Sequence, residues 1–104
     1  MTGFALHPEV FNDVDDIRQH ISENNPAAAK RMITEIFVAI RALVPFPHQG
    51  YRRTNLTSRP LRFKPVREYV IAYAPDERPL WVVAVFHGRR RPRVFVAMLR
   101  GREQ

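Results

Sequence analysis

The most hydrophobic stretch of the chain is Leu80–His87, where seven apolar residues stand in a row before a histidine. A strand with one face in water alternates polar and apolar residues, so this run predicts a strand that is covered on both faces. Tyr69–Ala74 is a second apolar run, and residues 61–64 alternate, which is typical of a strand. Turns are expected between the three runs, at 67–68 and 75–79, so the runs should form an antiparallel meander.

Residues 8–44 have the periodicity of two amphipathic helices. In the first helix, apolar residues recur every three or four positions and form one stripe, made of Val10, Val14, Ile17 and Ile21. Its polar face is expected to hold Asp13, Asp15, Asp16, Arg18 and Gln19. The second helix begins after Asn25, which can cap it, and ends before Pro45. Because the connection at 24–26 is so short, the two helices must form an antiparallel hairpin.

The remaining segments complete the fold class. Residues 3–6 are short and apolar and are expected to form an edge strand. Residues 93–100 are apolar without a clean period, so they could form a last strand or a short helix. Helices that are segregated from a run of strands are typical of α+β domains. We therefore predict one domain over residues 1–104, in which the helical hairpin packs on a small antiparallel β-sheet with the order β-α-α-β-β-β.

Composition narrows the function classes. The 104 residues include no cysteine, which excludes disulfides, thiolate metal sites and a cysteine nucleophile. The four histidines have no spacing typical of a metal site, and we expect neither a metal nor a cofactor. No apolar run approaches the roughly 18 residues of a membrane span, and the N-terminus lacks a signal-peptide pattern. We therefore expect a soluble, cytoplasmic protein without membrane contact.

The charge is strongly asymmetric along the chain. The net charge is +7, and thirteen of the seventeen lysine and arginine residues lie in residues 51–104. Most are arginines, whose planar donor fork suits phosphate and carboxylate groups. A polyanion or an acidic protein segment is the expected partner, although a merely solvated basic surface would have the same composition. The residues expected to bind the target or nucleic acid are Arg62, Lys64, Arg67, Arg89, Arg90, Arg91 and Arg93, within a wider basic cluster that also includes Arg52, Arg53, Arg59, Arg100 and Arg102.

His87 is the first candidate for chemistry, because it stands at the end of the most buried strand. A histidine can act as a general acid or base near neutral pH, but a histidine that hydrogen-bonds at the rim of the core has the same pattern. Tyr69 and Tyr73 are four residues apart on one strand and so face the same side. They could stack bases or orient a phosphate, or be core residues with the hydroxyl group at the edge.

The order and spacing of several short segments resemble those of a known family. These segments are Val14-Asp15-Asp16-Ile17, Asn25-Pro26-Ala27-Ala28-Ala29, Ile40-Arg41-Ala42-Leu43 with Phe46-Pro47, Gly50, Leu61-Arg62-Phe63, Tyr69-Val70-Ile71-Ala72-Tyr73 and Val85-Phe86-His87-Gly88-Arg89-Arg90. Together they are similar to the RelE/ParE superfamily of type II toxins, whose genes are also described as plasmid stabilisation genes. The resemblance implies a toxin that stops growth when it is free of its cognate antitoxin.

The resemblance also implies how the antitoxin binds. In this superfamily a C-terminal segment of the antitoxin, which we expect to be acidic, wraps across the helical hairpin and the sheet. The long second helix would offer a groove for an amphipathic helix. The residues expected to bind the antitoxin are Ile33, Phe37 and Ile40. Toxin and antitoxin are expected to form a hetero-oligomer.

The superfamily divides by target, which decides whether the chain is an enzyme. RelE-like members cleave mRNA on the ribosome, and in such an mRNA interferase the catalytic residues would be His87, Arg62, Arg89 and Tyr69. ParE-like members are associated with inhibition of DNA gyrase. Val70 stands where some ribosome-dependent members have an arginine, and the C-terminus lacks their His-Tyr or Tyr ending. We therefore favour a gyrase inhibitor, with an endoribonuclease as the alternative and a non-toxic nucleic-acid-binding domain as the third hypothesis.

Overall fold

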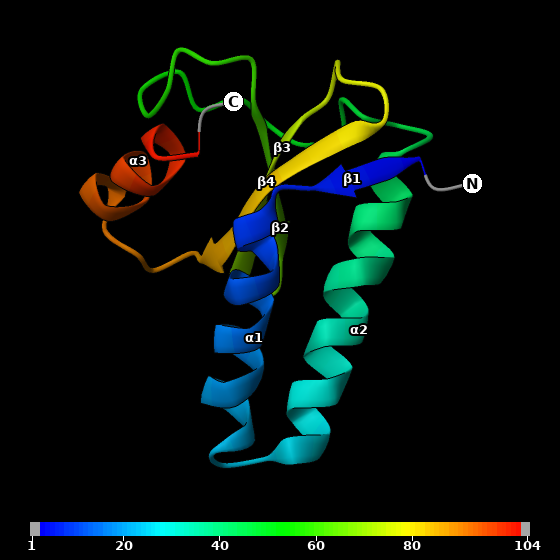
Figure 1. Cartoon of the computed structure of the whole chain (residues 1–104), viewed down its shortest axis with the longest axis vertical. Coiled ribbons are helices and arrows are strands. Elements are labelled where there is room, and N and C mark those ends of the chain that lie inside the picture. The colour runs from blue at the N-terminus through cyan, green and yellow to red at the C-terminus, as the bar shows by residue number, and fades with distance from the viewer. Residues whose placement is uncertain (1–2, 103–104) are drawn as a thin grey trace.

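Strand β4 (Leu80–His87) lies inside a four-stranded sheet, with β1 on one side and β3 on the other. The computed structural model describes residues 3–102 and places the strands in the order β1-β4-β3-β2 (Figure 1). The other elements are β1 (Phe4–Leu6), α1 (Pro8–Ser22), α2 (Pro26–Leu43), β2 (Arg62–Val66), β3 (Tyr69–Ala74) and α3 (Pro92–Arg100). The predicted α+β class is confirmed, with an N-terminal edge strand, a two-helix hairpin and a meander of three strands.

The sheet is mixed rather than wholly antiparallel. Strands β2, β3 and β4 pair antiparallel, as the short turns between them require, but β1 runs parallel to β4 from the pair Phe4 and Leu80 to the pair Leu6 and Val82. The direction of β1 could not be predicted, because the whole hairpin and two strands separate it from β4 and no turn joins them. Parallel strands need such a long crossover, which here contains the helical hairpin and the strands β2 and β3.

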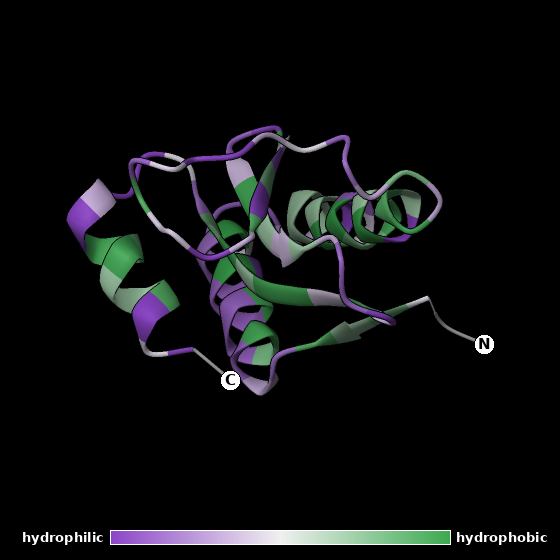
Figure 2. Ribbon diagram, turned by 90° about the horizontal axis from the view of Figure 1, so that it is seen from above, coloured by the Kyte–Doolittle hydropathy of each residue, from purple (hydrophilic) through white to green (hydrophobic). Residues whose placement is uncertain are grey.

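Both faces of β4 are buried, as its sequence predicts. One face lies under α1 and α2, where Val82 and Val85 join a core that also holds Ile36. The other face packs against α3, where the rings of Phe86 and Phe95 meet edge to face with their centroids 4.6 Å apart. Figure 2 shows β4 as almost entirely hydrophobic, whereas hydrophilic residues dominate the loops. The strand is therefore held rigidly from both sides up to its last residue.

Residues 93–100 belong to helix α3, which settles the choice between strand and helix. Pro92 occupies the first turn, where its fixed φ favours a helix. Phe95 and Leu99 are four residues apart, so they lie on one face of the helix and are buried against the sheet. Only these two residues of the short helix follow the helical period. Its other apolar residues are partly or fully exposed, so the pattern is not visible in the sequence.

Helices α1 and α2 form the predicted antiparallel hairpin, and each has a proline in its first turn. The side chain of Asn25 caps α2 by accepting a hydrogen bond of 3.0 Å from the backbone N–H of Ala28. The end of the hairpin that contains this connection extends beyond the sheet (Figure 1). Among residues 3–102, no helix combines the length and the apolar character that crossing a bilayer requires.

Asp13 is buried, so its predicted place on the polar face of α1 is wrong. Its carboxylate pairs with Arg102 through contacts of 2.6 and 2.8 Å, and both residues are less than a tenth exposed, at 8% and 9%. Strand β1 covers only Leu80–Val82 of β4, and the backbone beyond it needs other partners. The N–H of Val85 donates to Asp13 at 3.0 Å, and the carbonyl of Val83 accepts from Arg102 at 3.1 Å. The predicted place of Arg102 in an exposed cluster is wrong for the same reason.

Candidate functional site

An exposed arginine turn leaves the end of β4. We use the name arginine turn for residues 88–93, in which Gly88, Arg89, Arg90, Arg91 and Arg93 are exposed. Its backbone is fixed by hydrogen bonds from Gly88 N–H to the carbonyl of Glu68 at 2.7 Å and from Arg90 N–H to the carbonyl of His87 at 3.0 Å. The ion pairs formed within residues 3–102 involve none of its arginines. Four cations are therefore presented on a fixed backbone, without a carboxylate partner in the described part of the chain.

His87 and Tyr69 lie side by side at this end of the sheet. They are paired across β3 and β4, and their rings meet edge to face with centroids 5.2 Å apart. Nδ1 of His87 accepts a hydrogen bond of 2.9 Å from the N–H of Arg89, so its other ring nitrogen carries the proton when the ring is neutral. Tyr69 is 5% exposed, and burial, followed by the charge of Glu68, raises the pKa of its hydroxyl.

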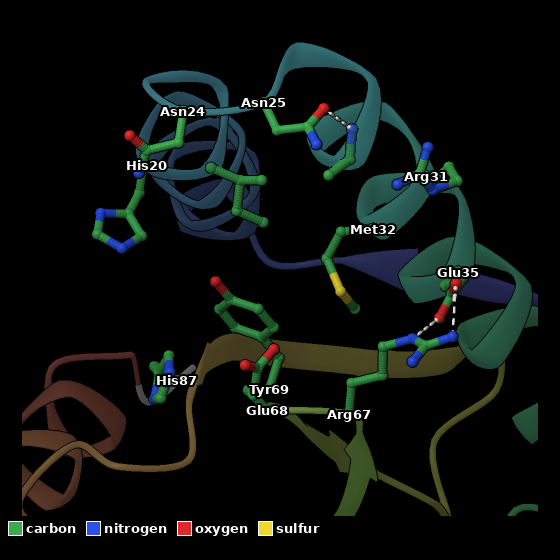
Figure 3. A pocket seen from close by; sticks show the side chains of 12 residues that line it. His20, Asn24, Asn25, Arg31, Met32, Glu35, Arg67, Glu68, Tyr69 and His87 are labelled. Carbon is green, nitrogen blue, oxygen red and sulfur yellow. Dashed lines mark hydrogen bonds and ion pairs between the residues drawn. The ribbon is translucent and has the colours of Figure 1, made fainter.

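A cleft opens beside this pair, between the overhanging end of the hairpin and the sheet. Its volume is about 540 Å³, within the range of small-ligand and side-chain pockets. The lining residues are His20, Ile21, Asn24, Asn25, Ala28, Arg31, Met32, Glu35, Arg67, Glu68, Tyr69 and His87 (Figure 3). A second cavity of about 280 Å³, lined among others by Asp16, Val85 and Arg90, shares His20, Tyr69 and His87 with the first. The two spaces therefore adjoin at Tyr69, and we call them together the hairpin cleft.

Arg67 closes one side of the hairpin cleft. It has a positive φ of 54° in the turn between β2 and β3, and its guanidinium contacts the carboxylate of Glu35 on α2 at 2.5 and 3.2 Å (Figure 3). The hydrogen bond from Arg67 holds the pKa of Glu35 below its usual value, and the same bond raises the pKa of Arg67. Arg67 thus joins the sheet to the hairpin, in addition to any role in binding the target.

Arg62 lies at the opposite end of the sheet from His87. It pairs with Tyr73, whereas His87 pairs with Tyr69, and its guanidinium donates to the carbonyl of Gly50 at 2.7 Å. Of the residues predicted to be catalytic in an endoribonuclease, Tyr69, His87 and Arg89 are thus brought together and Arg62 is not. Lys64, in the middle of β2, is half-buried, and the strand pairs place it opposite Ile71 and Val85, nearer to the arginine turn than Arg62 but still two strands away from β4.

The predicted antitoxin-binding residues of α2 differ in accessibility. Ile33 and Phe37 are half-buried and pack against the edge of the core, while Ile40 is completely buried within it. Ile33 and Phe37 can therefore contribute to a surface, but Ile40 supports that surface from below. Val38, which is 51% exposed, stands next to Phe37 on the outer side of α2.

The hairpin cleft has no motif in the sequence, because its walls come from the helix connection, the 67–68 turn and the end of β4. Element lengths give no clear signal either, because α2 and the eight-residue strand β4 are of similar length, about 27 and about 26 Å. Among residues 3–102 there is no group of three His, Asp or Glu side chains that could hold a metal ion.

Comparison with known proteins identifies the family. Residues 4–92 match the family model described as the ParE toxin of the type II toxin–antitoxin system, parDE. A comparison with curated proteins gave no match. The matched region contains β1, the hairpin, the meander and most of the arginine turn, and it stops where α3 begins. Because the match covers most of the chain, this protein belongs to the ParE toxin family of type II toxin–antitoxin systems.

Proposed function

We propose that the chain, when free of its antitoxin, inhibits growth by binding a complex of DNA gyrase and DNA through the arginine turn. The observation that carries this proposal is that Arg89, Arg90, Arg91 and Arg93 are exposed and have no carboxylate partner among residues 3–102, at the end of a strand that is buried on both faces. A gyrase target would place the toxin in the cytoplasm. The proposal makes the chain a binding inhibitor and not an enzyme.

The chemistry of the arginine turn suits such a target. Arginine binds phosphate and carboxylate groups through paired hydrogen bonds, and a concentrated positive field speeds encounter with an anionic surface. Three other basic residues are less available. The guanidinium groups of Arg59 and Arg62 donate to backbone carbonyls, and that of Arg67 is engaged with Glu35. We therefore assign Arg62, Lys64 and Arg67 a secondary part in target binding.

The test is a gyrase assay with purified toxin and supercoiled plasmid. We expect the wild-type toxin to increase the amount of gyrase-cleaved plasmid, and the double variant Arg89→Ser/Arg91→Ser to lose most of this effect. The matched control is Lys30→Ser/Arg41→Ser, which removes two exposed positive charges from α2. Equal activity of the two double variants would contradict a specific role of the arginine turn. No effect of the wild-type toxin on gyrase would reject the target.

The alternative is a ribosome-dependent endoribonuclease, which the contact between His87 and Tyr69 beside Arg89 favours. A histidine could move a proton during attack by a 2′-hydroxyl group, and Arg89 could stabilise the phosphate charge. In that case the toxin would cleave mRNA on purified ribosomes, and His87→Ala would abolish cleavage. The separation of Arg62 from His87 weighs against this mechanism. Intact mRNA after incubation with ribosomes and wild-type toxin would exclude it.

The cognate antitoxin is the partner that family membership implies. We propose that the two proteins form a hetero-oligomer and that the antitoxin segment that binds the toxin is acidic. The charge of +7 supports this view, because a strongly basic protein attracts an acidic partner at long range. The mass of the toxin–antitoxin complex, measured by light scattering, would give the stoichiometry.

A further inference from the structure

Two histidines of this chain make the same local hydrogen bond. Nδ1 of His7 accepts from the N–H of Glu9 at 3.0 Å, and Nδ1 of His87 accepts from the N–H of Arg89 at 2.9 Å. In both cases the accepting ring lies two residues before the donor. Asparagine and aspartate make the same bond through a side-chain oxygen, in the Asx-turn, and so hold the backbone that follows them. Each histidine ring therefore fixes a short segment of backbone.

The two bonds fix segments of different kinds. His7 is the N-cap of α1, and Glu9 lies in the first turn of that helix, so the first bond starts a helix. His87 is the last residue of β4, and Arg89 belongs to the arginine turn. The first bond is structural, whereas the second holds part of the surface that we propose to bind the target.

His87 supplies two of the three acceptors that hold the arginine turn. Its ring nitrogen accepts from the N–H of Arg89, and its backbone carbonyl accepts from the N–H of Arg90 at 3.0 Å. The third acceptor is the carbonyl of Glu68, to which the N–H of Gly88 donates at 2.7 Å. Three consecutive N–H groups are thus fixed. Because a side chain leaves the backbone in a direction set by φ and ψ, these bonds also set the directions of Arg89 and Arg90.

The ring of His87 is itself held in place. It packs edge to face on Tyr69, with ring centroids 5.2 Å apart, and Tyr69 is only 5% exposed. Within residues 3–102 the bond from Arg89 is the only hydrogen bond of the ring, and no carboxylate there is paired with it. A histidine that acts as a general base is commonly oriented by a third group. The contacts of this ring suit the holding of a backbone N–H better than the transfer of a proton.

Charged and titratable groups from several elements face the same space as the ring. Those that line the hairpin cleft with His87 are Asp13, Asp16 and His20 of α1, Arg31 and Glu35 of α2, Arg67, Glu68 and Tyr69 around the start of β3, and Arg90 of the arginine turn. Asp13 and Glu35 are each in an ion pair with an arginine. Groups of both signs therefore surround the ring, and its own protonation decides whether Nδ1 can accept a hydrogen bond.

We infer that His87 is a positioning residue of the target-binding surface, whose neutral ring holds the arginine turn in its binding arrangement through the bond from Arg89. Protonation of the ring places a hydrogen on Nδ1, breaks this bond and frees the turn. The inference rests on the proposed role of the arginine turn in binding the target. It differs from the endoribonuclease alternative, in which His87 moves a proton.

The first test compares two replacements of His87 in the gyrase assay. His87→Asn keeps an acceptor that can reach the N–H of Arg89, as in an Asx-turn, whereas His87→Leu has no acceptor. We expect His87→Leu to require about three- to tenfold more toxin for the same amount of cleaved plasmid, as for the loss of one hydrogen bond. The His87→Asn toxin should keep most of its activity. Equal losses in the two variants would overturn the inference.

The matched control is His7→Leu, which removes the same kind of bond at the start of α1. It should lower the free energy of unfolding, measured with urea, because α1 loses its cap. The toxin concentration that gyrase cleavage requires should not change when equal amounts of folded protein are compared. A loss of activity as large as that of His87→Leu would show that the effect at His87 is one of stability, and would overturn the inference.

The second test needs no target, so it separates this inference from the proposed function. In nitrogen-15 NMR spectra of wild-type toxin at about pH 8, the ring of His87 should carry its proton on Nε2. The amide signal of Arg89 should shift when the pH is lowered to about 5, and it should shift much less in His87→Asn. Equal shifts in the two proteins would overturn the inference. If the NMR results are as expected and wild-type toxin does not affect gyrase, the proposed target is rejected and the hold of His87 on the turn stands.

Discussion

The two ends of strand β3 are built from the same residue type and serve different purposes. At the Tyr73 end, the 46–51 loop folds over the sheet, and the tyrosine hydroxyl makes two hydrogen bonds to its backbone. At the Tyr69 end the hydroxyl faces the hairpin cleft. The comparison teaches that a buried tyrosine can be structural or available for binding, and that the partners of its hydroxyl distinguish the two roles.

The ends also differ in what holds them. The Tyr73 end is closed by neutral hydrogen bonds and by close packing around Gly50. At the Tyr69 end, ion pairs join distant elements: Arg67 with Glu35 on one side, and Arg102 with Asp13 on the other. An open cleft cannot be supported by packing across it, so its walls are tied together at the edges. The predictions that follow test this division.

Breaking the Asp13–Arg102 pair should have the largest effect. Asp13→Ala leaves Arg102 without its carboxylate and the N–H of Val85 without an acceptor, so we expect a loss of about 3–5 kcal/mol in the free energy of unfolding, measured with urea. The double variant Asp13→Ala/Arg102→Ala should lose little more than the single variant, since one interaction is removed in both. Asp16→Ala, at an exposed neighbour, is the control. A loss below 1 kcal/mol for Asp13→Ala would show that the pair does not support this end.

A methyl group should be far less tolerable at Gly50 than at Gly88. A Cβ at Gly50 would stand 2.6 Å from the Tyr73 hydroxyl oxygen and 3.0 Å from the carbonyl oxygen of Phe63, so the closed end would have to shift. We expect Gly50→Ala to cost about 2–3 kcal/mol. At Gly88 the nearest atom is the carbonyl oxygen of Glu68 at 3.3 Å, which needs only a small adjustment. Urea unfolding of both variants tests the difference, and equal losses would mean that the two ends are equally closed.

Much of this organisation could be predicted from the sequence. There are physical reasons why the rest could not be predicted. The run Leu80–His87 predicts a strand buried on both faces, and Asn25-Pro26 predicts the hairpin, because local pattern decides both. The burial of Asp13 could not be predicted, since its partner Arg102 lies at the other end of the chain and sits beyond the region that the family model matches. The different roles of Tyr69 and Tyr73 could not be predicted either. They depend on which hydroxyl group finds hydrogen-bond partners in the fold, and two tyrosines on one strand look alike in a sequence.

Removing the two hydroxyl groups should have opposite effects on stability. Tyr73→Phe leaves the buried N–H of Gly50 and the carbonyl of Pro47 without a partner, and we expect a loss of about 1–3 kcal/mol. Tyr69→Phe removes a hydroxyl that has no partner in the described residues, so the free energy of unfolding should stay the same or rise slightly. Urea unfolding measures both. A loss for Tyr69→Phe as large as that for Tyr73→Phe would place Tyr69 among the structural tyrosines.

The ion pair between Arg67 and Glu35 should have the smallest effect, and that effect should depend on pH. The pKa of Glu35 is lowered in the folded protein by its hydrogen bond to Arg67, so the folded state holds this proton less tightly than the unfolded state. The pair therefore adds stability above the unfolded pKa of Glu35, near 4.5, and that contribution disappears as the pH falls through the lower folded pKa. Arg67→Gln should reduce the unfolding midpoint at pH 7 and reduce it less at pH 3, and the effect at pH 7 should itself be small because both side chains face water. An equal reduction at both pH values would mean that Arg67 holds the turn through its positive φ and backbone position, and that its charge does not tie the cleft to α2.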